Sequence, residues 1–451
     1  MTHGFDATPN PIENRASSEP LGPHTVEKKS ETGLMQRLLH AFRLALAAPS
    51  RNPRTAVAVG RLLGAAFIIC FLTGIYSHFI QDPLPGMHFL TRPVWLYQVT
   101  QGVHITAGIA CFPLIFAKLY SIFPLLFQTP PLKGPLHFLE RASIALFVAS
   151  SLVEITTGLL NTFQWYALFP FPFRQTHFTL SFIVIGSLAI HIGVKLPIIV
   201  RYWSKKNAYT ASGEVVALPE VPDNLARLPL PDVGIGVTSR IFAWIDRAPA
   251  PVKPKVSRRG FMVTVGIGIA TVVGLTIGQS VRPLSFLNIF APREAGIGPN
   301  ALPVNRTAHA AKVLASAMSP DWRLTVASPV LSREFTRAEL EAMPQYTVEL
   351  PIACVEGWSQ MASWKGPRLK DLMDSVHANH GSYVRATSLE QGSIYAVMEM
   401  GPEFARDDLT LVALEVDGEK LDIDHGYPAR MIAPARPGVL QTKWLSRIEE
   451  I

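Results

Sequence analysis

Apolar residues gather in five long runs that all lie before residue 281 of the 451-residue chain. A helix needs about 20 apolar residues to cross the hydrocarbon core of a bilayer, and each run reaches that length. Pro113 and Pro124 interrupt the second run, where a proline can kink or end a helix. The pattern predicts five membrane-spanning helices, at 57–80, 95–127, 141–162, 177–201 and 261–280.

Polar segments precede and separate these runs. Residues 1–50 are rich in Pro, Ser, Glu and Lys and are expected to form a disordered tail. No apolar core follows Met1, so no cleavable signal peptide is expected there. Residues 203–257 are rich in proline and charged residues, which is typical of a linker.

Beyond residue 300 the chain is more polar and contains short strand-like segments. Residues 346–350 form one, and residues 411–416, which precede Asp417-Gly418, form another. An Asp-Gly pair beside apolar runs is a strong hairpin signal. The expected fold is an α-helical membrane bundle of four spans (51–202), a fifth tethering span (258–281) and a mainly-β α+β domain (282–451).

Composition and charge also favour a membrane protein. Hydrophobic residues make up 48% of the chain and charged residues only 17%, against about 25% in a typical soluble protein. The formal net charge of +7 does not indicate nucleic-acid binding, because the Lys and Arg residues are scattered and flank the apolar runs. The positive-inside rule places the N-terminus, the 128–140 loop and the 202–257 segment in the cytoplasm, and the C-terminal domain on the outer face.

The fifth run is preceded by residues 257–262, Ser-Arg-Arg-Gly-Phe-Met. This hexapeptide resembles a twin-arginine export signal placed inside the chain, although an Arg pair is also an ordinary cytoplasmic flank of a span. Twin-arginine export carries folded proteins, which suits a domain that receives a cofactor before export. The expected location is the cytoplasmic membrane of a bacterium, with several spans in contact with lipid.

Four histidines lie within the apolar runs or at their ends. An unpaired imidazole is costly in hydrocarbon, so such residues are candidates for function. Two of them, 14 residues apart on one predicted helix, return to within about 40° of the same direction and are separated by about 21 Å of rise. That spacing suits two haems stacked across a membrane. The four are His78, His104, His177 and His191, the last two forming the 14-residue pair.

The expected depths of these histidines suggest how they pair. His78 and His177 are expected near the outer surface, whereas His104 best matches His191. The preferred arrangement is an outer haem on the first pair and an inner haem on the second, and the pairing of His104 with His177 stays open. Without haem, the same residues could bond neighbouring helices or form a proton relay.

Residues 57–202 resemble the di-haem cytochrome b subunits of membrane oxidoreductases. The resemblance rests on the four spans and on the 14-residue histidine pair. It implies two b-type haems whose irons are held by imidazoles.

Three cysteines are present, and Cys354 alone lies outside the apolar runs. Cys70 and Cys111 are far apart in sequence and offer neither a disulfide framework nor a zinc spacing. Cys354 ends a strand-like segment and precedes a turn at Gly357. From the residues alone, its thiol could be structural, nucleophilic or a soft metal ligand, and no histidine base is close in sequence.

Three further motifs accompany Cys354, and with it they resemble the molybdopterin domain of the sulfite oxidase family over residues 300–450. They are Asn305-Arg306-Thr307, the 364–369 segment Trp-Lys-Gly-Pro-Arg-Leu, and the 424–430 segment Asp-His-Gly-Tyr-Pro-Ala-Arg, which continues to residue 445. The resemblance implies that Cys354 is the catalytic thiolate that ligates molybdenum. It also implies that the pterin and its phosphate are held by Asn305, Arg306, Thr307, His425, Arg430, Arg436 and Lys443, and Arg and Lys are usual phosphate ligands.

One departure from this family concerns the substrate. Sulfite oxidases have arginines soon after the cysteine that help to form an anion pocket, whereas here Glu356 follows Cys354 and the first arginine after it is Arg368. A carboxylate repels an anion by about 1 kcal/mol per contact in water, and by more when shielded. Sulfite is therefore not the expected substrate.

The predicted function is a membrane-bound, molybdopterin-dependent oxidoreductase. It passes electrons between a small-molecule substrate outside the cytoplasm and b-type haems that exchange them with quinone, quinol or another redox partner. The direction of electron flow is open, and reduction of a sulfoxide-like or N-oxide-like compound is one of the possibilities. Two alternatives are a haem electron carrier whose outer domain holds no molybdenum, and a non-haem transporter or sensor.

Overall fold

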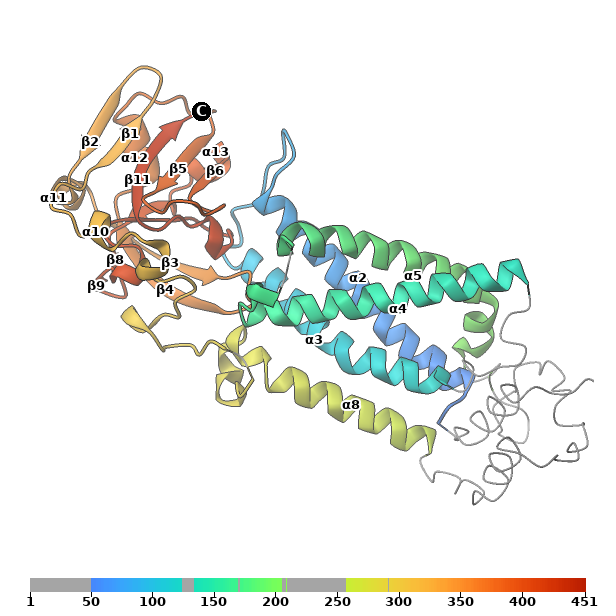
Figure 1. Cartoon of the computed structure of the whole chain (residues 1–451). Coiled ribbons are helices and arrows are strands. Elements are labelled where there is room, and N and C mark those ends of the chain that lie inside the picture. Colours follow the sequence, from blue (N-terminus) through green and yellow to red (C-terminus); the bar gives the residue numbers. More distant parts are fainter. Residues whose placement is uncertain (1–49, 124–133, 169–170, 205–207, 209–256, 291) are drawn as a thin grey trace, which may run out of the picture.

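The computed structural model describes residues 50–123, 134–168, 171–204, 208, 257–290 and 292–451. They form an elongated molecule with long helices at one end and a β-rich domain at the other (Figure 1). This order of a helical region and a β-rich region confirms the prediction. The predicted tail, nearly all of the predicted linker and Pro124 lie outside the described residues.

Five of the described helices are long and apolar enough to cross a membrane. Four of them run lengthwise beside one another, and the fifth, α8, lies along α3 (Figure 1). Pro113 lies inside α3, which continues to Ile122, so this proline does not end the helix. The five helices are α2 (Pro53–Gln81), α3 (Leu96–Ile122), α4 (Pro135–Thr162), α5 (Phe173–Trp203) and α8 (Arg258–Gly274).

Local sequence explains where two of these helices begin. The Asn52 side chain accepts a hydrogen bond from the Thr55 amide at 2.9 Å, and a proline follows Asn52 at the first helical position. The Ser257 hydroxyl accepts from the Gly260 amide at 3.1 Å, at the start of α8. Each cap satisfies a backbone N–H group that has no partner within the helix.

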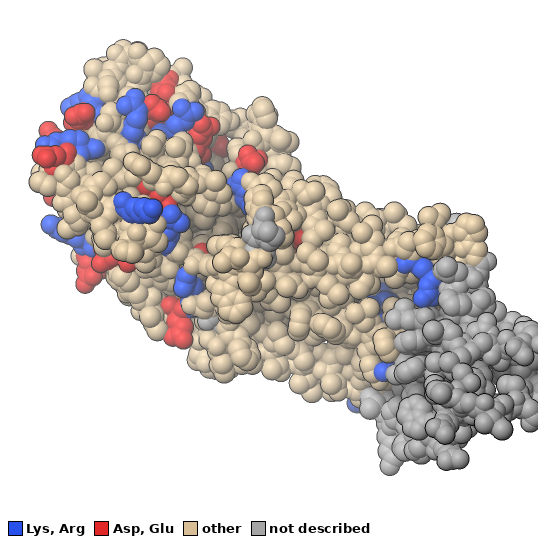
Figure 2. Space-filling view, in the orientation of Figure 1, with Lys and Arg blue, Asp and Glu red and all other residues tan. Residues whose placement is uncertain are grey.

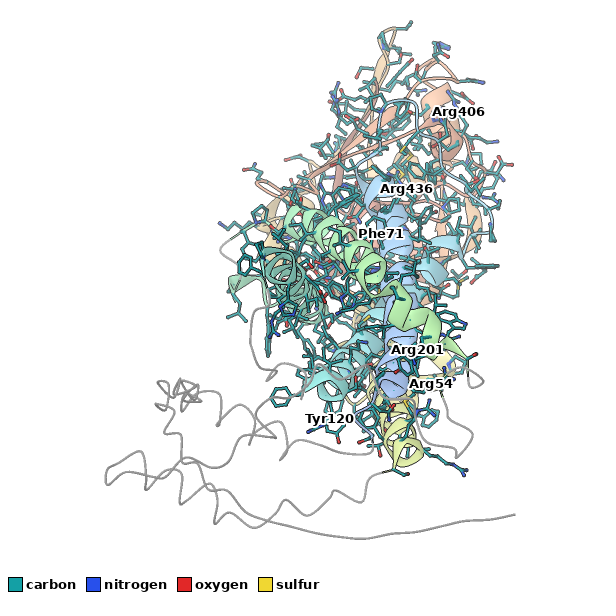
Figure 3. All side chains as sticks on the ribbon, turned by 90° about the vertical axis from the view of Figure 1, so that its right-hand side faces the viewer. Arg54, Phe71, Tyr120, Arg201, Arg406 and Arg436 are labelled. Carbon is teal, nitrogen blue, oxygen red and sulfur yellow. The ribbon has the colours of Figure 1, made fainter. Side chains whose placement is uncertain are left out.

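Charged side chains mark the two ends of the molecule. Arg54 and Arg201 lie at the end of the bundle that is remote from the β-rich domain, whereas Arg406 and Arg436 lie within that domain (Figure 3). The face of the helices seen in Figure 2 carries almost no charge between these ends. A belt without charge between two charged ends suits helices that lie in lipid.

The C-terminal part is built on three sheets. The largest has the strand order β2-β1-β11-β5-β6, with β1 and β11 parallel. A four-stranded antiparallel sheet has the order β3-β4-β8-β9, and β10 pairs with β7. The strands are β1 (Leu324–Ala327), β2 (Ser332–Phe335), β3 (Tyr346–Ala353), β4 (Ser359–Gly366), β5 (Val384–Ser388), β6 (Val397–Met400), β7 (Leu411–Ala413), β8 (Glu415–Val416), β9 (Glu419–Lys420), β10 (Arg430–Ile432) and β11 (Leu445–Glu450).

Short helices connect these strands and link them to the bundle. The α-helices are α9 (Ala308–Ala311), α10 (Leu314–Ala317), α11 (Arg337–Ala342), α12 (Leu369–Asp374) and α13 (Pro402–Ala405). The 3-10 helices are η2 (Tyr166–Leu168), η4 (Ile277–Gln279), η5 (Arg282–Leu287), η6 (Pro299–Ala301), η7 (Ile423–His425) and η8 (Gly438–Leu440).

The predicted strands are confirmed in one case and corrected in the other. Residues 346–350 lie inside β3, and Asp417-Gly418 joins β8 to β9 with φ angles of 50° and 82°, as a tight hairpin requires. The predicted strand at 411–416 is wrong as a single element. It is divided into β7 and β8, which belong to different sheets.

The segment between α2 and α3 joins the bundle to the β-rich domain. The Arg92 guanidinium forms two hydrogen bonds with the Asp407 carboxylate, at 2.7 and 2.9 Å. The Val94 carbonyl accepts from the Ala435 amide at 3.2 Å. Tyr97, at the start of α3, is buried in the same apolar cluster as the five-stranded sheet. The end of the bundle is therefore part of the core of the outer domain.

Trp364 is a central residue of the core beside the four-stranded sheet. It is fully buried, and its indole donates to the Leu350 carbonyl at 3.1 Å. Trp364→Ala should lower the free energy of unfolding by about 3–5 kcal/mol, because the cavity that it leaves cannot close completely. Chemical unfolding of the purified full chain measures this loss. Met361→Ala on the same strand is the control: Met361 is 39% exposed, so a comparable loss there would contradict the assignment.

Candidate molybdopterin site

Cys354 follows the last residue of β3 and begins a tight turn toward β4. Its backbone N–H donates to the Trp358 carbonyl at 2.9 Å, and its carbonyl accepts from the Gly357 amide at 3.0 Å. Gly357 has a φ of +100°, which favours glycine. The turn holds the thiol in a fixed position, and Cys354 is buried.

Burial raises the pKa of the Cys354 thiol well above its usual value, and the nearby Glu356 carboxyl adds to the increase. Lys443 and Arg293 act in the opposite direction. The thiol is therefore protonated at neutral pH, and a bound metal cation would displace that proton. Among the described residues, no cluster of three or more His, Cys, Asp and Glu side chains could hold a metal ion by itself.

His425, Arg430 and Lys443 form a basic cluster in which His425 and Arg430 are buried and Lys443 is half-buried. Arg430 is fully buried, and its guanidinium donates to the carbonyls of His425 at 3.0 Å and Gln441 at 3.4 Å. Burial lowers the pKa of Arg430 to about 9, and burial together with the Arg430 charge lowers the pKa of Lys443 to about 7. The Arg430 Nε atom is buried without a hydrogen-bond partner. Buried cations held mainly by carbonyls suit an anionic ligand such as a phosphate.

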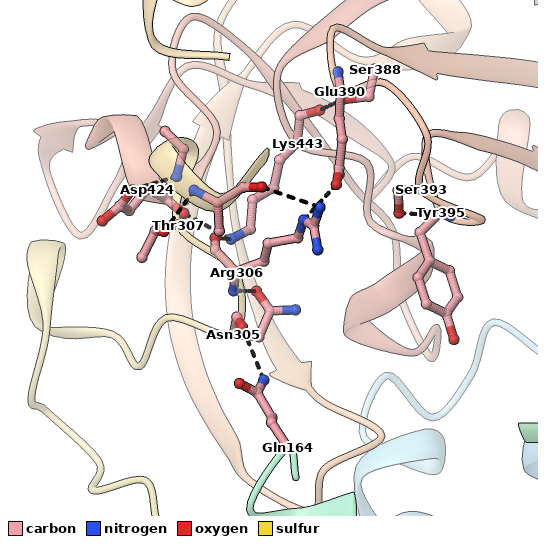
Figure 4. A network of polar contacts seen from close by, with 12 residues as sticks. Gln164, Asn305, Arg306, Thr307, Ser388, Glu390, Ser393, Tyr395, Asp424 and Lys443 are labelled. Carbon is pink, nitrogen blue, oxygen red and sulfur yellow. Dashed lines mark hydrogen bonds and ion pairs between the residues drawn. The ribbon is translucent and has the colours of Figure 1, made fainter. Parts of the chain in front are cut away.

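Asn305, Arg306 and Thr307 lie beside this cluster (Figure 4). The Lys443 ammonium donates to the carbonyls of Arg306 at 2.9 Å and Asp424 at 2.7 Å. The Arg306 Nε atom lies 2.5 Å from a carboxylate oxygen of Glu390. The Thr307 hydroxyl caps the short helix α9, so Thr307 also has a local structural role.

Arg436 has different neighbours from the other predicted cofactor ligands. Its guanidinium donates to the Glu399 carbonyl at 2.8 Å and lies 4.9 Å from the centre of the Phe404 ring. It lines a small pocket together with Met87 and Phe89 from the α2–α3 segment. These contacts give Arg436 a position where the bundle meets the outer domain rather than in the basic cluster.

A cavity of about 850 Å³ extends from the bundle into the outer domain. On the bundle side it is lined by apolar residues of the long helices and by three of the four predicted histidines. On the other side it is lined by Val355 and Glu356 of the Cys354 turn and by loops of the β-rich domain. The polar lining residues from the two sides include His78, His104 and His177, and Asn305, Arg306, Thr307, Glu356 and Tyr395.

The structure brings His104 and His177 together. Their ring centroids are 6.4 Å apart. The His104 Nδ1 atom lies 3.0 Å from the Cys70 carbonyl, and the His177 Nδ1 atom lies 3.3 Å from the Thr157 hydroxyl. The His177 Nε2 atom lies 3.2 Å from a Glu154 carboxylate oxygen.

The other two histidines lie against aromatic rings. His78 is stacked on Phe178, with ring centroids 3.5 Å apart, and His191 lies 5.8 Å from Phe147. In this structure His104, and not His78, faces His177, which differs from the preferred pairing and agrees with the one left open; haem ligation by these histidines stays a prediction. Depth along the helices alone could not reveal this arrangement, because the rotation of each helix decides which imidazoles face one another.

The sequence analysis did not identify several polar residues of the cavity. Gln164 donates to a Glu356 carboxylate oxygen and to the Asn305 carbonyl, the latter at 2.9 Å. The indole of Trp358 donates to Glu356 at 3.2 Å. Burial raises the pKa of the Glu356 carboxyl. Glu154 could have been found from the sequence, because a single acidic residue inside an apolar run is unusual. Nothing in the sequence distinguished Gln164 from other polar residues.

Comparison with known proteins identifies the outer domain. The family described as "Oxidoreductase molybdopterin binding domain" matches residues 310–451. The mitochondrial sulfite oxidase of Drosophila melanogaster is 29% identical over 157 residues, covering 28% of this chain and 27% of that protein. The sulfite oxidase of Arabidopsis thaliana is 24% identical, covering 25% of this chain and 37% of that protein. Residues 310–451 are a molybdopterin-binding oxidoreductase domain of sulfite oxidase type.

The chain thus carries a domain of a molybdopterin-binding oxidoreductase family. It is also similar to the putative protein-methionine-sulfoxide reductase subunit YedZ1 of Azospira oryzae, with 27% identity over 129 residues, covering 28% of this chain and 48% of that protein. The chain spans about a quarter to a half of the length of these relatives.

Lys443 makes the stability of the cofactor-free molybdopterin domain depend on pH. Because the pKa of Lys443 is lowered from 10.5 to about 7, the unfolded chain binds this proton more tightly than the folded chain. Stability should therefore rise with pH between about 7 and 10.5, and Lys443→Met should remove part of that rise. Unfolding of the cofactor-free full chain across this pH window measures the effect. The exposed Lys420→Met is the control, and an unchanged pH profile in Lys443→Met would contradict the lowered pKa.

Proposed function

We propose that this chain is a membrane-bound oxidoreductase that reduces a sulfoxide at Cys354 with electrons from a b-type haem in the helical bundle. One observation carries the proposal. A single cavity is lined at one end by the facing imidazoles of His104 and His177 and at the other by Val355 and Glu356, the residues that follow Cys354. Two redox groups held at these ends would share one cavity.

The bundle end of the cavity suits a haem. Metal–imidazole bonds are about 2 Å long, so two rings whose centroids are 6.4 Å apart can ligate one metal atom between them. A Cβ atom on Gly74 would lie 3.1 Å from the His104 ring, and one on Gly158 would lie 3.5 Å from the His177 ring. These glycines leave room for the imidazoles, and the apolar lining suits a macrocycle.

The outer end suits the molybdopterin centre. Cys354 would supply the metal ligand, and the buried Arg430 and the half-buried Lys443 would hold the phosphate. Asn305, Arg306 and Thr307 would hold the pterin from the side of the cavity. When bound, the molybdenum centre supplies two-electron oxygen-atom chemistry, and the chain supplies binding, orientation and protons.

Glu356 supports the reductive direction. Reduction of a sulfoxide consumes two electrons and two protons and releases the sulfide and water, so the site needs a proton donor. Glu356 lines the cavity and its pKa is raised by burial, which favours the protonated carboxyl. The Azospira oryzae relative, a putative protein-methionine-sulfoxide reductase subunit, points to the same class of substrate.

The membrane arrangement follows from the charges. The basic end of the bundle would face the cytoplasm, and the molybdopterin domain would face outward, delivered by the fifth span and its twin-arginine-like start at Arg258 and Arg259. Quinol would supply the electrons. The expected second haem would be ligated by His78 or His191 together with a further ligand.

Cofactor content tests this assignment. Cys354→Ser should keep haem and lose activity, with molybdenum bound weakly. His104→Ala and His177→Ala should lose the b-type absorption bands of the haem that these two histidines would hold, but keep molybdenum. Metal analysis and reduced-minus-oxidised spectra measure both, and the exposed His380→Ala is the control. Wild type without b-type bands would favour a non-haem transporter or sensor, and wild type without molybdenum would favour a non-catalytic outer domain.

Substrate specificity tests the direction. A purified chain whose haem has been reduced should be reoxidised by methionine sulfoxide, and an oxidised chain should not be reduced by sulfite. Glu356→Gln should slow the reoxidation by about 10²-fold, because the proton donor is lost. Stopped-flow absorbance of the haem bands measures the rate. Reduction of the haem by sulfite at a comparable rate would reverse the proposed direction.

A further inference from the structure

The Val355 carbonyl, one residue after Cys354, accepts hydrogen bonds from two different long helices. The Gln101 Nε2 atom of α3 donates to it at 3.0 Å, and the Asn161 Nδ2 atom of α4 donates at 3.3 Å. A carbonyl oxygen has two lone pairs, so both bonds can form at once. The peptide next to the predicted metal ligand is therefore fixed by the bundle and not only by its own domain.

Each of these two amides is itself oriented by a tyrosine. The Tyr97 hydroxyl donates to the Gln101 Oε1 atom at 3.5 Å, and the Tyr166 hydroxyl donates to the Asn161 Oδ1 atom at 2.9 Å. An amide whose oxygen accepts from a hydroxyl presents its NH₂ group on the other side. The two tyrosines thus direct both NH₂ groups at Val355.

The rest of the turn is also in contact with the bundle and its extension. A Cβ atom on Gly357 would lie 3.0 Å from the Ile105 side chain, and the Gly357 carbonyl accepts from the Ser280 hydroxyl. Gln98 donates to the Ser359 hydroxyl at 3.1 Å. All these partners are uncharged, so they hold the turn without burying a net charge.

The same two helices position the facing imidazoles: His104 lies on α3, and α4 contacts His177, which belongs to α5. His104 is three residues after Gln101 on α3, which places both on one face of the helix. Thr157, whose hydroxyl lies 3.3 Å from His177, is four residues before Asn161 on α4. On α3, His104 is therefore close to Gln101, which donates to the Val355 carbonyl. On α4, the His177 contact Thr157 is close to Asn161, which donates to the same carbonyl.

We propose that Gln101 and Asn161 are positioning residues that set the distance and contact between the haem site and the molybdenum site. This inference rests on the proposed function. Electrons pass across a fixed contact at Val355, without separation of the outer domain from the bundle during turnover. Two one-electron transfers across it match one two-electron reduction of substrate, and quinol is the reductant.

Substitutions that remove these donors test the proposal. Gln101→Met and Asn161→Leu keep the approximate volume, and each removes one of the two donors to the Val355 carbonyl. Tyr166→Phe is a milder variant that only releases the Asn161 amide. Gln98→Met is the matched control. It also removes a side-chain amide donor from α3, but the lost hydrogen bond is to the Ser359 hydroxyl and not to the Val355 carbonyl.

The first readout is the rate of haem reoxidation by sulfoxide in a single turnover of the purified full chain. Gln101→Met and Asn161→Leu should slow it by roughly ten- to a hundred-fold, since a displacement of about 1 Å at a reacting centre has effects of this size. Tyr166→Phe should fall between these variants and wild type. Haem and molybdenum contents should stay those of wild type, and Gln98→Met should stay within about twofold of it.

The second readout is hydrogen exchange of the peptide that contains residues 354–359, measured by mass spectrometry on the full chain without molybdopterin. The Cys354 and Gly357 amides should exchange about tenfold faster in Gln101→Met and Asn161→Leu than in wild type, and Gln98→Met should not show this increase.

The outcomes separate this inference from the proposed function. Wild type without haem or molybdenum would overturn both. Wild type with both groups, but with unchanged electron transfer and exchange in Gln101→Met and Asn161→Leu, would overturn the positioning role alone. A Gln98→Met variant that is as slow as the others would also overturn it. The rate would then depend on any contact between the bundle and the outer domain, and not on the Val355 contact in particular.

Discussion

The relative position of the bundle and the outer domain depends on the contact between the turn after Cys354 and the long apolar helices α3 and α4. The Val355 carbonyl between Gln101 and Asn161, together with Gly357 against Ile105, joins the two parts at the residue next to Cys354. An unpaired carbonyl at such a buried position would cost about 1–3 kcal/mol. Since helix and turn satisfy each other there, the relative position of the two parts is fixed where the chemistry is expected.

The polar side chains on the two sides of this contact have different kinds of partners. In the outer domain, the buried Arg430 and the half-buried Lys443 are held by carbonyl oxygens, and desolvation of their charges lowers both pKa values. An anionic cofactor would offset that desolvation, so the domain gains stability on binding it. In the bundle, by contrast, the polar atoms of His104 and His177 find uncharged or acidic partners nearby, which orients the rings.

A chain that contains both parts gains a fixed geometry between them. The Arg92–Asp407 pair and the insertion of Tyr97 into the outer core hold the α2–α3 segment against the molybdopterin domain. Arg92 and Asp407 are 315 positions apart in the sequence. A short and constant separation suits electron transfer. Because both sites belong to one folded chain, the entropy of bringing them together is lost once on folding and not at each electron transfer.

The sequence by itself determined the apolar helices, the β-rich region after them, the tight Asp417-Gly418 hairpin and the molybdopterin family with Cys354 in its turn. These features follow from local periodicity, turn chemistry and motif order, which a chain carries without its fold. Only the tertiary structure decided that His104 faces His177, that residues 411–416 are divided between two sheets and that Arg436 has other partners. Helix rotation and contacts between distant residues set these features, and neither is encoded in a local pattern.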